Sequence, residues 1–292
     1  MMTANRPMVA SAAVHARALR SRAIGTAMVI LLAVIGSHQS GRWASRTAVV
    51  RPVADAGVVE PDRPADKITG AGAGCRPGMV LDLSRWKLTL PAGSGHNPTQ
   101  ILPVGLGQIL NSPFFQPNAT CSGVVFRAPV TGVTTPGSHY PRSELREMAG
   151  EGAPAAWSST VGTHWLGVYE AFTALPRGKP ELVGAQIHDA TEDISVFRLE
   201  GNHLWITNGN NSHYQLITDN YALGTVFFAG YLVTHGQIGA YYNGKLVAQI
   251  GRAFTNGYFK AGAYTQANCT NAPCDPNNLG ETVIYALTTS HS

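Results

Sequence analysis

Short runs of alternating apolar and polar residues restrict the fold of this chain more than any other feature. From Cys75 onward, runs such as WKLTL (86–90) and TVIYALTT (282–289) follow one another, separated by Gly, Pro and Asn. YYNGKLV places Asn243-Gly244 between two such runs, which is a strong signal for a tight β-hairpin. No long 3.6-residue period occurs outside the N-terminal region. Many short strands at this spacing predict an all-β protein, an antiparallel β-sandwich of the jelly-roll kind.

The N-terminal region differs from the rest in composition. Residues 1–44 carry five Arg and no acidic residue, and they include the apolar stretch AIGTAMVILLAVIG (23–36). That stretch is too short to span a bilayer comfortably, so residues 1–44 are predicted to be a signal peptide or leader, with a retained membrane anchor as the alternative. Residues 45–74 are rich in Ala, Val, Pro, Asp and Gly and are predicted to be a flexible linker. The folded domain is then expected to be residues 75–292.

The distribution of charge argues against nucleic acid as a partner. The whole chain has a formal net charge of +4, but from Cys75 onward 12 Lys and Arg stand against 13 Asp and Glu. The basic excess therefore belongs to the leader, and no nucleic-acid binding is expected. We expect a secreted, extracellular monomer without stable membrane association once the signal is removed.

Four cysteines suit an exported protein, which can keep disulfides. Cys269 and Cys274 bracket the short loop TNAP, so this pair, together with Cys75–Cys121, is the favoured connectivity among the three that four cysteines allow. No CxxC or His-rich spacing suggests zinc, and no metal or cofactor is expected.

Three of the predicted strands carry polar side chains two residues apart, which places them on one face of each strand. Taken singly, each row has an ordinary explanation, as a solvated charged face, a structural histidine or a core phenol. The rows are Arg142, Glu144 and Arg146 in PRSELREM, Gln186 and His188 in GAQIHDA, and Tyr258, Lys260, Tyr264 and Gln266 in YFKAGAYTQ.

The three rows are more informative together than singly. Side by side on one concave sheet, they would form a substrate-binding trough lined by guanidinium, ammonium, imidazole, amide and phenol groups. Arg and Gln can hold a carboxylate, while Tyr and His can transfer protons. This inventory of groups favours an acidic polysaccharide as the substrate.

The segments RSELREM, QIH and YFKAGAYTQ resemble, in the expected order, the three signature segments of the alginate lyases of polysaccharide lyase family 7. DLSRWKLTLP (82–91) is similar to the start of that family's domain, and the resemblance runs from about Cys75 to the C-terminus. One departure is Thr265, where the family usually has Asn. Because Thr265 follows Tyr264 directly, it is expected to lie on the opposite face of the strand.

The resemblance implies a lyase that cleaves alginate by β-elimination, without a metal or a covalent intermediate. Arg142 and Gln186 are similar to the family's residues that neutralise the substrate carboxylate. His188 would remove the C5 proton of the uronate, and Tyr264 would donate a proton to the departing O4 oxygen. On mannuronate, Tyr264 would serve as both base and acid, helped by a cation such as Arg146 or Lys260.

The remaining row members are expected to bind substrate or to support the row. Glu144 and Glu147 would not form the carboxylate pair of a hydrolase, because residues three apart on a strand face opposite ways. Glu144 is instead expected to orient Arg142 and Arg146. The other substrate-binding candidates are Arg146 itself, Tyr258, Lys260 and Gln266.

Two other functions stay open at this point. A non-catalytic carbohydrate-binding β-sandwich is one, since such folds bind glycans without cleaving them. A lyase for another polyuronate, such as glucuronan, is the other. Family members with Ile in the QIH segment tend to accept guluronate, so Ile187 and the presence of a separate base and acid predict activity on guluronate-containing blocks.

Overall fold

The structure is a computed structural model that describes residues 74–109, 112–150 and 152–292. The predicted leader and all of the predicted linker except Gly74 lie outside these residues. The chain divides into two units, 1–50 and 51–292, and every described residue belongs to the second. No helix in the described part is long and apolar enough to cross a membrane.

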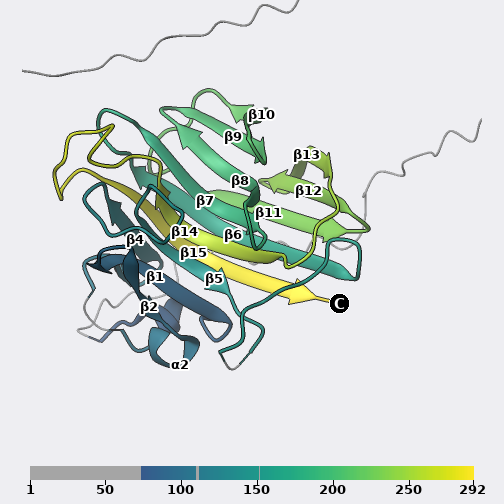
Figure 1. Cartoon of the computed structure of the whole chain (residues 1–292), viewed down its shortest axis with the longest axis horizontal. Coiled ribbons are helices and arrows are strands. Elements are labelled where there is room, and N and C mark those ends of the chain that lie inside the picture. Colours follow the sequence, from purple (N-terminus) through teal and green to yellow (C-terminus); the bar gives the residue numbers. More distant parts are fainter. Residues whose placement is uncertain (1–73, 110–111, 151) are drawn as a thin grey trace, which may run out of the picture. The chain divides into compact units, whose positions relative to one another are not determined.

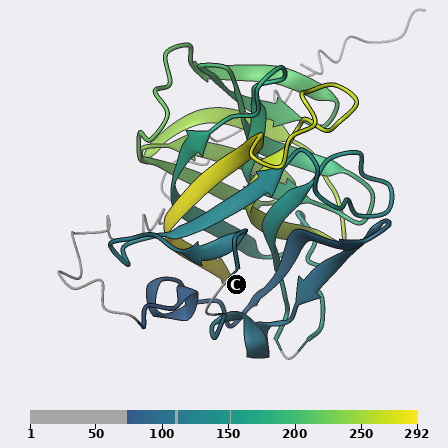
Figure 2. The same ribbon diagram turned by 90° about the vertical axis from the view of Figure 1, so that its left-hand side faces the viewer.

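Two antiparallel sheets make up nearly all of the regular secondary structure of the described residues (Figure 1, and from the side in Figure 2). The eight-stranded sheet has the spatial order β10 (Asn211–Thr218), β9 (His203–Asn208), β8 (Asp193–Glu200), β7 (Glu181–His188), β14 (Tyr258–Thr265), β5 (Arg142–Glu147), β1 (Trp86–Ser94), β2 (Asn97–Ile101). The seven-stranded sheet has the order β13 (Lys245–Gly251), β12 (Gln237–Tyr242), β11 (Phe227–Thr234), β6 (Thr163–Ala174), β15 (Leu279–His291), β4 (Val124–Pro129), β3 (Phe115–Pro117). Two short helices complete it, α1 (Pro77–Val80) and α2 (Pro103–Leu106). The predicted antiparallel jelly-roll sandwich is confirmed.

The strands follow the alternating runs of the sequence closely. The predicted hairpin joins β12 and β13 through Asn243 and Gly244, whose φ angles of 49° and 75° are those of a type I′ turn. Two strands, β2 and β3, were not predicted. Each lies at the edge of its sheet and contains a proline, Pro98 or Pro117. Proline argues against a strand in a sequence but is tolerated at a sheet edge, where its missing N–H costs no hydrogen bond.

The hydrophobic core lies between the two sheets. Fully buried aromatic and aliphatic side chains come from the facing surfaces of both sheets, and burying one such Leu or Phe side chain stabilises a fold by about 1.5–3 kcal/mol. They include Leu88, Leu145, Ile187 and Phe259 from the eight-stranded sheet and Phe126, Phe172 and Tyr231 from the other.

The inward faces of the signature strands confirm the predicted alternation. Leu145, Ile187 and Phe259 are each completely buried in the core. Glu147 also points inward, where its Oε2 accepts hydrogen bonds from Trp157 Nε1 and from the Phe259 amide, both at 3.0 Å. Polar residues one position away on the same strands therefore face the other side of the sheet.

Both predicted disulfides, Cys75–Cys121 and Cys269–Cys274, are present. The second closes a small loop after β14. Next to it, Asn268 Nδ2 donates to the His139 carbonyl at 2.9 Å, so this loop supports a segment that borders the outer face of the eight-stranded sheet.

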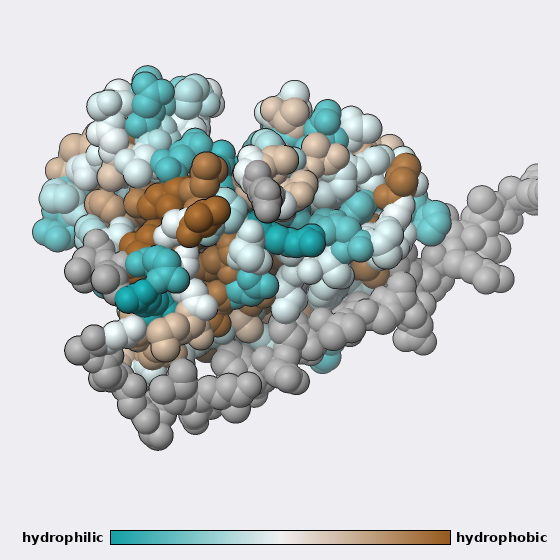
Figure 3. All heavy atoms as spheres, turned by 90° about the horizontal axis from the view of Figure 1, so that it is seen from below, coloured by the Kyte–Doolittle hydropathy of each residue, from teal (hydrophilic) through white to brown (hydrophobic). Residues whose placement is uncertain are grey.

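Apolar side chains also reach the surface near the two helices. Met79, Leu102 and Val104 are exposed there, Val104 almost completely. Figure 3 views the molecule from below, the side on which α2 lies in Figure 1, and shows apolar residues gathered among polar ones on that face.

Candidate active site

The three polar rows lie on adjacent strands, because β14 runs between β7 and β5 in the sheet. Tyr264 is opposite Arg142 on β5, and Lys260 is opposite Arg146. On the other side, Tyr258 is opposite His188 and Lys260 is opposite Gln186 on β7. The pairing of strands thus brings together residues that are up to 122 positions apart in the sequence.

A groove of about 510 Å³ lies over these rows. Segments 135–140 and 190–193 border it, and β1 and β2 extend it beyond β5. A second hollow of about 210 Å³ continues it across β8 and β9. Tyr264 and Asp193 line both hollows, which together cross the sheet from β2 to the β9–β10 turn. The row residues that line the larger groove are Arg142, Glu144, Arg146, His188, Tyr258, Lys260 and Tyr264.

Glu144 is the centre of the polar network. Its side chain is almost completely buried and accepts hydrogen bonds from Arg142 Nη1 at 3.2 Å, from Lys260 Nζ and from Gln186 Nε2. Burial alone would raise the pKa of Glu144, but Lys260 and Arg142 together hold it below its ordinary value. Glu144 therefore carries a negative charge that fixes one side chain from each of the three strands.

Arg146 does not share this carboxylate, contrary to the expectation that Glu144 orients both arginines. Its Nη1 donates to the Glu147 carbonyl at 3.0 Å, and its guanidinium lies 3.8 Å from the centre of the Tyr258 ring. In the strand register Gly262 is opposite Glu144 and Lys260 is opposite Arg146. The Lys260 side chain reaches diagonally to Glu144, and the Arg146 side chain lies on Tyr258, the next outward residue of β14.

Tyr264 lies against Arg142, whose guanidinium carbon is 3.8 Å from the centre of the phenol ring. Ser138 Oγ is 3.2 Å from the Tyr264 hydroxyl and accepts from Arg142 Nη2 at 2.8 Å. Lys260 Nζ is 5.9 Å from the Tyr264 ring. Arg142 is thus the cation in direct contact with the phenol, rather than Arg146 or Lys260 as expected from the sequence.

His188 is held as a neutral imidazole. Its Nδ1 lies 2.6 Å from the Asp189 carbonyl and 3.1 Å from the Tyr258 hydroxyl. A carbonyl can only accept, so Nδ1 carries the proton, and in the neutral ring Nε2 is the unprotonated nitrogen. The ring stacks on Tyr258 with the ring centres 5.3 Å apart. Burial lowers the pKa of His188, and the positive charge of Lys260 adds to this effect. A neutral imidazole is the form that can accept a proton.

Lys260 is itself buried, and burial, followed by the charge of Arg142, lowers its pKa to about 8. Its ammonium group is bound to Glu144. Lys260 lines the groove, where it can contact substrate. Because it is buried and bound to Glu144, it also holds the polar network together.

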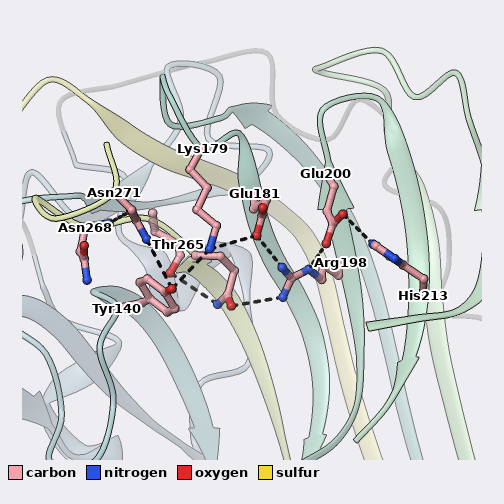
Figure 4. Close-up of polar contacts among 10 residues, drawn as sticks. Tyr140, Lys179, Glu181, Arg198, Glu200, His213, Thr265, Asn268 and Asn271 are labelled. Carbon is pink, nitrogen blue, oxygen red and sulfur yellow. Dashed lines mark hydrogen bonds and ion pairs between the residues drawn. The ribbon is translucent and has the colours of Figure 1, made fainter. Parts of the chain in front are cut away.

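Gln186 and Gln266 line the smaller hollow, where both are nearly buried. Gln266 Oε1 accepts from Arg198 Nη1 at 3.3 Å. Figure 4 shows Arg198 between Glu181 and Glu200, each bound at 2.5 Å. Two carboxylates therefore neutralise the cation at this end of the site.

Comparison with known proteins connects this site to one family. A family model described as alginate lyase matches residues 81–291. The crystal structure of the alginate lyase from Corynebacterium sp. is 51% identical, covers 75% of this chain and 100% of that chain, and has a TM-score of 0.73. AlgAT5, an alginate lyase of polysaccharide lyase family 7, is 39% identical, covers 74% of this chain and 99% of that chain, and has a TM-score of 0.70. The chain belongs to the alginate lyases of polysaccharide lyase family 7.

A third structure includes a bound oligosaccharide. It is a variant of the family 7 alginate lyase A1-II′ in complex with a substrate written GGMG, 28% identical, covering 75% of this chain and 97% of that chain, with a TM-score of 0.62. No curated protein sequence matches the chain.

The departure of the lyase from the usual family sequence at Thr265 lies outside the groove. Thr265 is completely buried, and its hydroxyl donates to the Ala128 carbonyl on β4 at 2.7 Å. Its expected place on the face opposite Tyr264 is confirmed. In the described part of the lyase, no group of three or more His, Cys, Asp and Glu residues is placed to hold a metal ion.

Sequence reasoning missed several residues that line the groove. Lys87 and Thr89 alternate with buried residues in WKLTL and form a fourth polar row on β1. The same test for alternation would have found them. Gln100, Ser138 and Tyr140 also border the groove, but β2 and the segment 135–140 show no period from which their direction could be read.

Proposed function

We propose that this lyase is exported, acts as a monomer and cleaves guluronate-containing blocks of alginate by β-elimination, with His188 as the base and Tyr264 as the acid. The observation that carries the proposal is that a neutral imidazole and a phenol line one groove together with Arg142, Lys260 and Glu144, and that the Glu144 carboxylate also binds Gln186 from the adjoining hollow. All of these groups come from one chain, and the export signal is the predicted leader at residues 1–44.

The difficult step is removal of the C5 proton, because the neighbouring carboxylate is already negative and takes up more charge as the proton leaves. Arg142 and Gln186 supply N–H groups that stabilise this charge as it develops. Glu144 holds both donors in place before substrate binds. Less side-chain conformational entropy is therefore lost when the substrate carboxylate binds.

His188 accepts the C5 proton through its free Nε2, and Tyr264 protonates the O4 oxygen as the C4–O4 bond breaks. A double bond then forms between C4 and C5. The positive charge of Arg142 on the phenol ring favours the tyrosinate left after the transfer.

Guluronate suits this arrangement because its C5 proton and O4 lie on opposite faces of the ring, which calls for a separate base and acid. His188 and Tyr264 meet that need from different strands. Ile187 supports the proposal indirectly, since it is completely buried behind Gln186 and His188 and its volume affects where they lie. The relative described in complex with GGMG, where G and M are the usual letters for guluronate and mannuronate, also supports it.

The test measures the ultraviolet absorbance of the unsaturated product on guluronate-rich, mannuronate-rich and glucuronan substrates. We expect cleavage of guluronate-rich or mixed alginate, and Tyr264→Phe should lower the rate at least about a hundredfold. Tyr214→Phe, at an exposed tyrosine on β10 outside both hollows, is the matched control. Near-normal turnover by Tyr264→Phe, or activity on glucuronan alone, would contradict the proposal.

A further inference from the structure

Two cations face each other in the groove at the side of β1 and β5. Lys87 on β1 is directly opposite Arg146 on β5, and both side chains line the groove. Like charges in directly opposite positions destabilise a sheet. Stability of the fold therefore does not explain why Lys87 and Arg146 occupy opposite positions.

Neither cation has a carboxylate partner within the described residues, whose ion pairs include neither Lys87 nor Arg146. Lys87 Nζ donates to Gln100 Oε1 on β2 at 2.9 Å. Arg146 bonds a backbone carbonyl and lies on the Tyr258 ring. Burial lowers the pKa of Lys87, and the charge of Arg146 lowers it further, as expected for two cations close together.

The other cations of the two hollows are compensated. Arg142 and Lys260 share the carboxylate of Glu144, and Arg198 lies between Glu181 and Glu200. The uncompensated positive charge of the site is therefore concentrated at one end, on β1 and β5.

We propose that Lys87, together with Arg146, binds a second carboxylate of the uronate chain, at a subsite beyond the reacting sugar. This inference rests on the proposed function and extends it to a sugar that does not react. Lys87 lies two strands from Lys260, about 10 Å at ordinary strand spacing, so the carboxylate belongs to a neighbouring ring of the polymer.

The geometry suits a carboxylate in particular. An ammonium and a guanidinium that face each other can each donate to one of its two oxygens, and such charge-assisted bonds are stronger than those between neutral groups. Gln100 restrains the ammonium, so less freedom is lost when the ligand binds. Binding of the anion also removes the repulsion between the two cations.

Lys87→Met tests the subsite, with Lys245→Met as the matched control. Lys245 is an exposed lysine on β13, in the other sheet, so its replacement changes the net charge equally without touching the groove. On long alginate, Lys87→Met should raise KM by about tenfold, as expected for loss of one charge-assisted contact, and change kcat by less than about twofold. Lys87→Arg keeps the charge and should restore most of the affinity.

Thermal unfolding separates this role from a structural one. Because Lys87 and Arg146 repel each other, Lys87→Met should unfold at the same temperature as the wild type or higher. An unchanged KM, or a fall in kcat together with a lower unfolding temperature, would overturn the inference. Neither result would affect the proposed function, which fails instead if the wild-type enzyme does not cleave guluronate-containing alginate or if Tyr264→Phe remains active.

Discussion

Two buried carboxyl groups of this lyase, Glu144 and Glu170, have opposite protonation states. Glu144 is surrounded by donors, which keep it ionised. Glu170 on β6 is completely buried in the core and accepts one hydrogen bond from the Ala185 amide at 3.2 Å, while its Oε2 has no hydrogen-bond partner among the described residues. Burial raises the pKa of Glu170 to about 8, so it is protonated at neutral pH. The number of donors around each residue decides the difference.

Glu170 should make the fold less stable as the pH rises. In the unfolded chain a glutamate ionises near pH 4.5, whereas in the folded protein it keeps its proton up to about pH 8. Between these values the folded state holds the extra proton, so the free energy of unfolding decreases as the pH rises, by roughly 5 kcal/mol in all.

Glu170→Gln should remove this dependence, because the amide keeps the acceptor for Ala185 and cannot ionise. Denaturant unfolding of both proteins from pH 4.5 to pH 8.5 checks this. The variant should match the wild type near pH 4.5 and exceed it at pH 8. Parallel stability curves over the whole range would show that Glu170 does not titrate in this way.

At the scale of a strand, a bulge in β7 determines which side chains face the groove. Val183 and Gln186 both line the smaller hollow although they are three residues apart, because the register against β8 shifts between them. Gly184 and Ala185 form the bulge and both face the core, Gly184 so close to Glu170 that a Cβ there would lie 2.6 Å from a carboxyl oxygen. Glu170 and Gly184 together therefore set the direction of Gln186 and His188.

Gly184→Ala should disturb this strand because the added methyl group has no room beside Glu170. We expect a loss of roughly 1–3 kcal/mol in the free energy of unfolding, the usual cost of overpacking. We also expect kcat to fall by about tenfold or more, since small displacements of catalytic groups are costly. Denaturant unfolding and the product absorbance assay measure the two effects.

Gly105→Ala is the control for that experiment, since its new methyl group would meet only the end of the Ile101 side chain, at 3.7 Å. It should leave activity and stability close to those of the wild type. A Gly184→Ala enzyme with normal kcat would mean that the position of Gln186 and His188 does not depend on the bulge.

For the whole domain, the distribution of charge matters more than its sum. The residues from Cys75 onward have nearly balanced charge, whereas the groove lining has four cations, Lys87, Arg142, Arg146 and Lys260, against three carboxylates, Glu144, Glu192 and Asp193. A nearly neutral domain cannot attract a polyanion from far away. Attraction must therefore be local to the groove.

The KM for long alginate should rise moderately with salt. The screening length falls from about 10 Å at 0.1 M salt to about 3 Å at 1 M, so the groove cations lose part of their hold on the polymer. Steady-state assays over this range, with sodium and potassium chloride compared to detect specific ion effects, provide the measurement. A KM independent of salt would argue against an electrostatic contribution to binding.

The sequence by itself determined most of the strands and the faces of their side chains, but not the proline-containing edge strands β2 and β3. Alternation is a local property with a period of two, so the outward direction of Arg142, His188 and Tyr264 and the inward direction of Ile187 could be predicted without the fold. The turn signal at Asn243-Gly244 is local in the same sense. The three signature segments made the family recognisable, because each is a continuous stretch of sequence.

Only the tertiary structure decided which residues meet across strands. The binding of Glu144 to Lys260 and Gln186 rather than Arg146, and the opposition of Lys87 and Arg146, depend on the order and register of strands that are far apart in the sequence. The bulge in β7 contacts Glu170 from the other sheet, whose Oε1 accepts from the Ala185 amide. Pairing and register are set by packing over the whole sandwich, and no local pattern in the chain contains that information.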